Sequence, residues 1–236
     1  MSTTYLIGCS HIFGAEMPGT TSKNAIPSKN TYFYKIAEKL KTDNIVNLSI
    51  CGTSNYNLYT VFFNLYDNLK SDDKVIIQWT YFSRWSPWFD NFNSFTLYSD
   101  DPNNFFETIK DEKNTSFLKI RKHILEFFYF FYVILKQKFL IFDQFNFILL
   151  AHLLLEKRNI KHVFTYTDFN KKINAVSEKH LIKMNANAKF LFDKNLGFFE
   201  YGDELNFKKY ARGHFKEEYH DYLFDNYGQE IINILK

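Results

Sequence analysis

The sequence predicts a three-layer α/β/α sandwich with a mostly parallel central sheet, formed by one domain over residues 1–236. Three observations predict this fold class. Short apolar runs suited to buried strands alternate with segments of helical periodicity. The strand-like runs lack the alternation of a half-exposed strand, as expected when helices cover both faces of a sheet. The chain contains no internal repeat, low-complexity tract or linker that would divide it.

In the first third of the chain the predicted strands and helices alternate. The apolar run 5–8 ends in glycine and is predicted to be a strand, and the Gly-, Pro- and Thr-rich segment 14–27 a loop. Apolar residues at helical spacing predict helices, and continuous apolar runs predict strands. The expected elements are, in order, a helix over 31–40, a strand over 44–49, a helix over 56–69 and a strand over 73–79.

The remainder of the chain is less regular. Residues 83–115 are rich in aromatic side chains without any period, and they are predicted to form an irregular excursion. Long excursions in compact domains are often functional. A long helical segment over 116–158 follows, expected as one helix to about 142 and a second over 145–158. A strand over 161–166 then precedes a tail that ends in a helix from Glu217.

The composition excludes several classes of protein. The 29 Lys and Arg against 26 Asp and Glu give a net charge of +3 without a basic cluster, which argues against nucleic acid as a partner. Two cysteines make no disulfide framework. Lysines interrupt the apolar run 123–135, so no membrane span is predicted. The amino terminus has no basic region, so no signal peptide is expected, and the predicted location is cytoplasmic or virion-associated.

Aromatic residues make up 20% of the chain, with 28 Phe and 16 Tyr. Those in the predicted helix 117–142 are expected to pack in the core or at an interface between subunits. An interface there would imply a homo-oligomer or a larger assembly. The seven histidines are spread out, and no metal-ligand spacing occurs on a predicted helix. We therefore expect neither a metal nor a cofactor.

Turns of small residues follow the predicted strands, at the sheet edge where ligands bind in parallel α/β folds. One is Gly8-Cys9-Ser10-His11, and another spans residues 51–55. A histidine near the other terminus, His214, can return to the same edge. A serine on a sharp turn, a histidine base and backbone N–H groups together permit acyl transfer.

Three of these segments resemble signature blocks of the SGNH (GDSL-type) hydrolase family, in the same order. Residues 7–14, Ile-Gly-Cys-Ser-His-Ile-Phe-Gly, are similar to the first block and place the nucleophile on Ser10. Residues 48–55 are similar to the second block, whose glycine N–H faces the oxyanion, here Gly52 together with the N–H of Ser10. Residues 214–220 resemble the last block, which places the base on His214 and a structural role on His220.

Cys9 replaces the Asp of the family signature, and the chain departs from the family's pattern at two further positions. No Asn follows the strand that ends at Trp79, so the remaining oxyanion donor would come from Thr80, Ser83 or Asn55. Losing one such donor costs about 10²–10³ in rate. Ala211 and Arg212 stand where the family has an Asp before the base. Either a backbone carbonyl or a carboxylate of the preceding loop, Asp203 or Glu204, would then orient the imidazole.

The resemblance implies a serine ester hydrolase that acts on a small ester, with an O-acetyl group on a glycan as the favoured substrate. The residues expected to contact substrate are His11, Trp79, Thr80, Ser83 and Trp85. Aromatic rings stack well on sugar faces. The alternatives are a catalytically inactive binding or structural protein of the same fold, for example one encoded by a phage, and an enzyme that transfers an acyl group to a sugar.

Overall fold

The computed structural model describes residues 1–20, 26–80, 84–85, 97–98, 136–167 and 197–236. Within these ranges, four strands form a central sheet in the order β2-β1-β3-β6. The strands are β1 (Thr3–Ile7), β2 (Asn44–Asn47), β3 (Lys74–Trp79) and β6 (Lys161–Tyr166). All three pairings are parallel. The predicted parallel sheet is confirmed.

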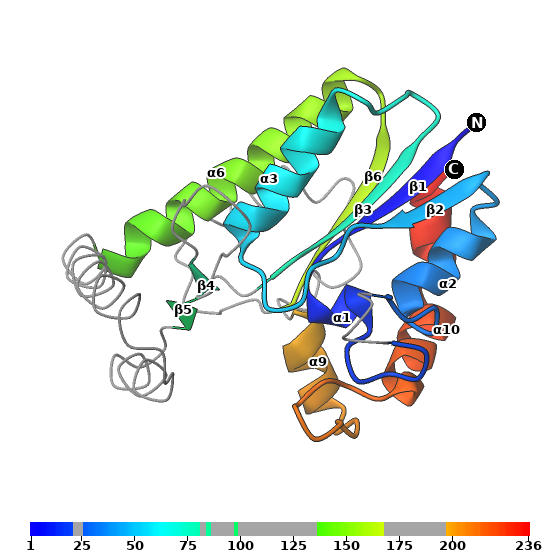
Figure 1. Cartoon of the computed structure of the whole chain (residues 1–236), viewed down its shortest axis with the longest axis vertical. Coiled ribbons are helices and arrows are strands. Elements are labelled where there is room, and N and C mark those ends of the chain that lie inside the picture. Colours follow the sequence, from blue (N-terminus) through cyan, green and yellow to red (C-terminus); the bar gives the residue numbers. More distant parts are fainter. Residues whose placement is uncertain (21–25, 81–83, 86–96, 99–135, 168–196) are drawn as a thin grey trace, which may run out of the picture.

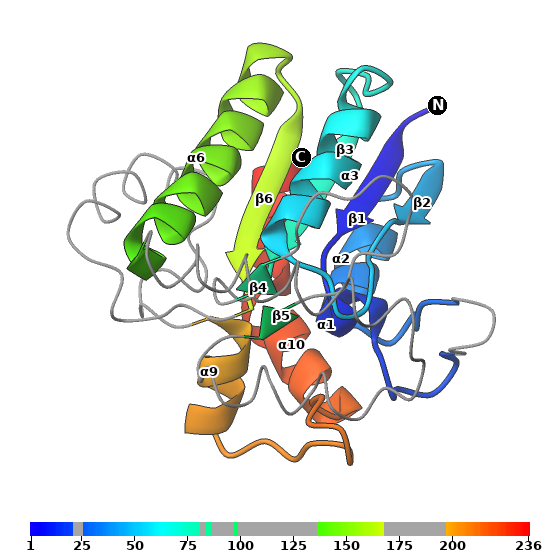
Figure 2. The ribbon, with the colours of Figure 1, turned by 60° about the vertical axis from the view of Figure 1, so that its left-hand side comes forward.

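Helices cover both faces of this sheet (Figures 1 and 2). One face carries α3 (Asn55–Tyr66) and α6 (Lys136–Lys157), and the other carries α2 (Tyr32–Lys39) and α10 (Glu217–Leu235). Two shorter helices, α1 (Ser10–Phe13) and α9 (Phe198–Glu204), lie near the end of the sheet where the strands terminate (Figure 2). The three-layer α/β/α fold class is therefore confirmed.

Each face of the sheet has its own hydrophobic core, because successive side chains of a strand point to opposite faces. From β3, Val75, Ile77 and Trp79 join the core beneath α3 and α6. Ile76, between them, joins the core beneath α2 and α10. The absence of polar alternation over residues 75–77 thus reflects burial on both sides.

Side-chain caps set where α2 and α3 begin. The hydroxyl of Thr31 accepts a hydrogen bond from the Tyr34 N–H, and that of Ser54 accepts one from the Asn57 N–H, both at 3.4 Å. Such caps satisfy N–H groups that have no acceptor inside the helix. The helix predicted over 31–40 begins one residue later for this reason.

The region between β3 and β6 differs from the prediction in one respect. The break expected between residues 142 and 145 is absent, because α6 runs without interruption from 136 to 157. The sequence of α6 contains neither Gly nor Pro, and its polar residues Asp143 and Gln144 do not break a helix.

Of the excursion 83–115, the structure describes β4 (Arg84–Trp85) and β5 (Leu97–Tyr98), which pair antiparallel. The other residues of that excursion, and helix 117–142 as far as residue 135, lie outside the described residues.

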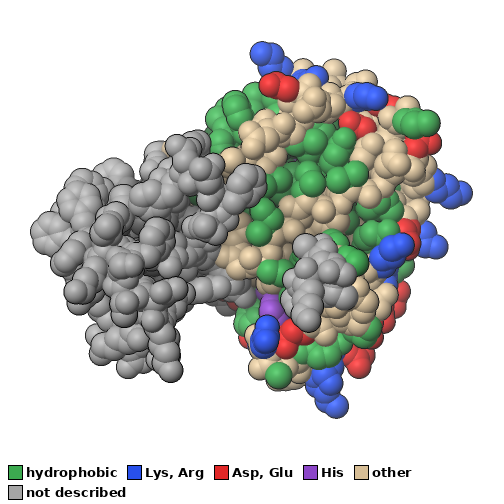
Figure 3. Space-filling model, viewed as in Figure 1, with side chains coloured by type: hydrophobic (Ala, Val, Ile, Leu, Met, Phe, Trp, Pro, Cys, Tyr) green, Lys and Arg blue, Asp and Glu red, His purple; other side chains and the backbone are tan. Residues whose placement is uncertain are grey.

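The described surface agrees with the low net charge. Positive and negative side chains are interspersed on the face shown in Figure 3, while hydrophobic ones gather over α3 and α6. Among the described helices, none combines the length and the apolar character that a membrane span requires.

His220 joins the two helices that cover the second face of the sheet. It is buried in α10, and its Nδ1 accepts a hydrogen bond from the backbone N–H of Tyr32 at the start of α2 (3.3 Å). Burial lowers the pKa of His220 to about 3 from its usual 6.5, and the nearby Lys35 charge adds to this effect. The native ring therefore stays neutral while the unfolded chain takes up a proton.

This buried ring predicts acid sensitivity. Between pH 6.5 and about 3 the unfolded state binds one more proton at this site, so native stability falls as the pH falls. At about 1.4 kcal/mol per pH unit, the free energy of unfolding should drop by about 2 kcal/mol more in the wild type than in His220→Gln between pH 7 and pH 5. Urea titrations at the two pH values measure this difference. Parallel pH profiles of the two proteins would contradict the assignment.

Candidate active site

The candidate site is built on the turn where β1 ends. Ser10 is the first residue of α1, so its position follows directly from the carboxyl end of a central strand. The residue is 6% exposed. Next to it, the backbone N–H of Ile50 donates to the carbonyl of Gly8 (2.9 Å), which holds the turn after β2 against the turn after β1.

Two glycines make this turn possible. A Cβ on Gly8 would lie 2.6 Å from the Ile12 side chain and 3.2 Å from the carbonyl of Gln78. Gly14 has φ +71° and ends α1, and a Cβ there would lie 2.6 Å from Ser28. Only glycine fits both positions without displacing a neighbour. The glycines of the first block are thus explained by close packing and backbone conformation.

Cys9 stands where the family signature has Asp, and it serves as the N-cap residue of α1. Its thiol is buried and lies 3.3 Å from the hydroxyl of Thr167, just after β6. The N–H of Thr167 donates to the carbonyl of Trp79, and its carbonyl accepts from the N–H of Phe199, both at 2.7 Å. These contacts hold the start of α1, which bears Ser10, against the end of β3 and the start of α9.

His214 is presented by a tight turn in the segment between α9 and α10. Lys209 and Phe215 form an antiparallel bridge, and the N–H of Tyr210 donates to the carbonyl of His214 (2.7 Å). Gly213 occupies the left-handed region, with φ +88°. Phe215 is fully buried and anchors the turn to the core. The His214 side chain itself remains 20% exposed.

The carboxylate that orients His214 is Glu16. The Nδ1 of His214 lies 2.7 Å from Oε2 of Glu16, and the backbone N–H of Arg212 donates to Oε1 (2.9 Å). Since a carboxylate accepts, Nδ1 carries a proton, and in the neutral ring the lone pair is then on Nε2. This is the tautomer that a general base requires.

Two further observations distinguish Glu16 from an ordinary surface carboxylate. Burial raises the pKa of Glu16, but hydrogen bonds from His214 and Arg212 outweigh it, and the pKa lies below its usual value. Its backbone has φ +68°, a left-handed conformation that costs an L-residue about 1–2 kcal/mol. Strained residues of this kind cluster at functional sites.

The two carboxylates expected to orient the base lie elsewhere. Asp203 forms an ion pair with Lys209, and Glu204 is exposed on α9. Sequence analysis missed Glu16 because it follows the first block, 198 positions before His214. The only signal in the sequence is an acidic residue two positions after Gly14, and no family spacing points to it.

His11 lies between the two halves of the candidate site. It is 5% exposed, and its ring packs against those of His214 and Phe198, with centroids 5.3 Å and 4.8 Å apart. His214 therefore contacts the residue that directly follows Ser10. These surroundings favour a positioning role for His11 over the predicted contact with substrate.

Asn55 connects three elements through its amide. Its Oδ1 accepts from the N–H of Thr80 (2.6 Å), while its Nδ2 donates to the carbonyl of Thr80 (3.1 Å) and to Oε1 of Gln144 (2.7 Å). Both amide hydrogens are thereby engaged. To serve as the predicted oxyanion donor, the Asn55 amide would have to give up one of these two bonds. Thr80 is fully buried beside it.

Gly52 has φ +72° and, in contrast to Gly8 and Gly14, nothing would lie within 4 Å of a Cβ built on it. Its conformation is therefore the reason for glycine at this position. The contact between Ile50 and Gly8 brings this turn alongside the Ser10 turn. The role of its N–H toward an oxyanion stays a prediction.

The predicted aromatic contacts to substrate need one correction. Trp79 has no exposed surface, because its side chain points into the core under α3 and α6, where it packs edge-on against Phe164 at 5.6 Å. Ser83 lies outside the described residues. Trp85 belongs to β4, whose side chains are also outside the description.

No protein-family model and no curated protein sequence matches this chain. Solved structures do. A member of the lipolytic G-D-S-L family from Veillonella parvula is 9% identical, with a TM-score of 0.46 over 97% of both chains. TesA is 11% identical, with a TM-score of 0.49 over 99% of this chain and 100% of that chain. An acetyl xylan esterase from Butyrivibrio proteoclasticus is 13% identical, with a TM-score of 0.47 over 99% of this chain and 63% of its own. At these identities the similarity concerns the fold alone.

Proposed function

We propose that this protein is a serine ester hydrolase in which Ser10, His214 and Glu16 form a catalytic triad. The observation that carries the proposal is the 2.7 Å contact between Nδ1 of His214 and the Glu16 carboxylate, beside the turn that bears Ser10. In the family's pattern the acid precedes the base histidine closely in the chain. Here the proposed acid, Glu16, instead comes from the segment that follows the nucleophile. The triad is recognised by geometry and roles, whatever the order of its members in the chain.

In this mechanism Ser10 Oγ attacks the carbonyl carbon of the ester while Nε2 of His214 takes the hydroxyl proton. The resulting imidazolium lies against the Glu16 carboxylate, which stabilises the positive charge. The proton then passes to the leaving alkoxide, and the acyl group stays on Ser10. Water, deprotonated by His214, attacks the acyl-enzyme and releases the acid, which restores the serine.

The negative oxygen of the tetrahedral intermediate needs hydrogen-bond donors. We assign the backbone N–H groups of Ser10 and Gly52 to this role. Ser10 is the first residue of a helix, where N–H groups have no acceptor within the helix. Asn55 is a weaker candidate because both of its amide hydrogens already have acceptors.

The small exposure of Ser10 favours a small acyl group. Ser10 is 6% exposed, so an ester reaches its hydroxyl only through a small opening in the present arrangement of side chains. An O-acetyl ester, for example on a glycan, therefore remains the proposed substrate class. Trp79 cannot stack on a sugar, because its ring is fully buried.

A series of p-nitrophenyl esters tests the substrate class. We expect kcat/KM to be highest for acetate and to fall by about tenfold or more at octanoate, since the longer chain has to displace buried side chains. Acetate release from acetylated xylan then tests the glycan. Equal or higher turnover of the long esters would contradict the small-acyl assignment without affecting the triad.

The alternative is an inactive binding or structural protein of the same fold. The absent third-block Asn favours it, because one oxyanion donor is missing. Covalent labelling of Ser10 by a fluorophosphonate separates the two functions, because only the hydrolase is expected to react.

A further inference from the structure

A second cluster of chemically reactive side chains lies at the other end of the sheet. His152 and Glu156 are one turn apart near the end of α6, and His162 is the second residue of β6. Ligating atoms of all three residues lie within 4.8 Å of one another. Because β6 starts here and ends near α9, this cluster is remote from Ser10 (Figures 1 and 2).

The hydrogen bonds around His162 fix which of its nitrogens is available. Its Nδ1 lies 2.8 Å from the carbonyl oxygen of Ile160, which can only accept, so Nδ1 carries the proton. Its Nε2 therefore presents a lone pair, and this lone pair faces Nδ1 of His152 at 2.8 Å. A metal-ligating histidine usually donates a hydrogen bond from its other ring nitrogen to a carbonyl or carboxylate, as His162 does here.

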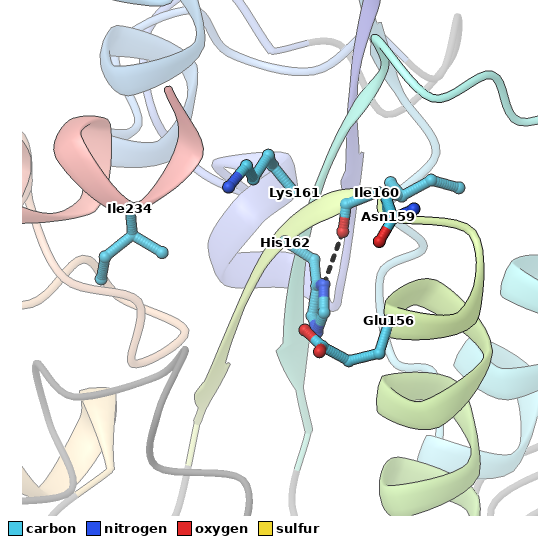
Figure 4. Close-up of a pocket in the computed structure, with 6 residues that line it drawn as sticks. All are labelled: Glu156, Asn159, Ile160, Lys161, His162 and Ile234. Atoms are coloured by element: carbon cyan, nitrogen blue, oxygen red, sulfur yellow. Dashed lines mark hydrogen bonds between the residues drawn. The ribbon is translucent and has the colours of Figure 1, made fainter.

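The third donor comes from the edge of a pocket. Glu156 is exposed, and Figure 4 shows its carboxylate beside the ring of His162, with the Lys161 side chain directed away from it. The pocket, of about 210 Å³, is lined by Glu156, Asn159, Ile160, Lys161, His162 and Ile234. The pocket therefore gives solvent access to the Glu156 and His162 side of the cluster.

We propose that His152, Glu156 and His162 bind a divalent transition-metal ion, for which zinc is the favoured candidate. Two imidazole nitrogens and one carboxylate suit Zn²⁺, which commonly takes three protein ligands and a water. For Zn–N bonds of about 2.0–2.1 Å at tetrahedral angles, the two nitrogens have to separate to about 3.4 Å. From the present 2.8 Å this requires only a small movement, together with transfer of the His152 proton to its outer nitrogen.

The sequence argued against such a site because no two histidines have ligand spacing on one helix. The ligands instead come from a helix and the strand that follows it, and the fold brings them together. A bound ion would tie the end of α6 to the start of β6, and it would stabilise the native state because the unfolded chain lacks the assembled site.

Metal binding by the full-length, chelator-stripped protein tests the proposal. Zn²⁺ is titrated against a chromophoric competitor, and Co²⁺ is titrated with detection of its visible absorption. We expect one ion per chain, a tetrahedral Co²⁺ spectrum and a higher Tm in zinc. Glu156→Gln should weaken binding by about tenfold or more, since it replaces a charged carboxylate ligand with a neutral amide. Its matched control, Glu230→Gln on an exposed position of α10, should bind as the wild type does.

Glu156 is exposed, so its variant is expected to fold even where replacing the buried His162 disrupts the core. Absence of saturable binding by the folded wild type would overturn the proposal. Binding of equal strength by the wild type and Glu156→Gln would overturn it as well, because the ion would then lie elsewhere. Ester hydrolysis is not a readout of this experiment, so its result is independent of the triad.

Discussion

Ser10→Ala is expected to lower kcat/KM for p-nitrophenyl acetate by about 10⁴-fold or more. Without the hydroxyl there is no acyl-enzyme, and the remaining groups can at most hold the ester and its oxyanion. Stopped-flow or steady-state release of p-nitrophenol measures the loss. The substitution removes one small group at a 6% exposed position, so the variant should keep its fold.

Ser71→Ala is the matched control, because Ser71 is an exposed serine in the turn before β3. Its activity should equal that of the wild type. If Ser10→Ala and Ser71→Ala hydrolyse the ester equally well, another residue carries the reaction and the assignment of the nucleophile is wrong.

Glu16→Gln is expected to lower kcat by about 10³–10⁴-fold with little change in KM. An amide at this position can donate to Nδ1 of His214, which stabilises the tautomer that cannot act as a base at Nε2. It also removes the negative charge that faces the developing imidazolium. Steady-state kinetics measures the split between kcat and KM, and circular dichroism verifies that the variant keeps the overall secondary structure of the wild type.

Asp203→Asn and Glu204→Gln are the controls for this substitution. They replace the carboxylates that sequence reasoning placed near His214, but Asp203 pairs with Lys209 and Glu204 faces solvent. Both should stay within about twofold of the wild type. A large loss in either control, together with an active Glu16→Gln, would mean that a different carboxylate orients the base.

The sheet was predictable because its strands are signalled locally. A continuous apolar run bounded by polar residues marks β3, and the strand predicted over 161–166 has the same bounds as β6. The order of strands and helices along the chain then implies parallel pairing, since parallel neighbours need a crossover. The position of Ser10 directly after β1 follows from the same pattern.

Other features depend on contacts that leave no local signal. The Glu16–His214 pair joins residues 198 positions apart, and the left-handed backbone of Glu16 is unusual for a non-glycine residue. The apolar run of β3 shows that both faces are covered, but not that Trp79 packs wholly within the core. Asn55 was predicted as an oxyanion donor from its place in a turn, whereas its partners Thr80 and Gln144 are distant in sequence.

The metal cluster depends on tertiary contact in the same way. His152 and His162 meet only because α6 folds back onto β6, and the chain between them has no spacing typical of metal ligands. Histidine and carboxylate pairs divided between a helix and the following strand are therefore found from the fold and not from the sequence.

The central claim is that Ser10 is a nucleophile activated by His214 and Glu16, and labelling with a fluorophosphonate tests it most directly. The serine oxygen displaces fluoride and forms a stable phosphonyl ester, which peptide mass spectrometry locates. We predict one adduct per chain, on Ser10, formed far more slowly in Glu16→Gln. A folded wild-type protein that remains unlabelled, or that carries its adduct on another residue, would contradict the claim.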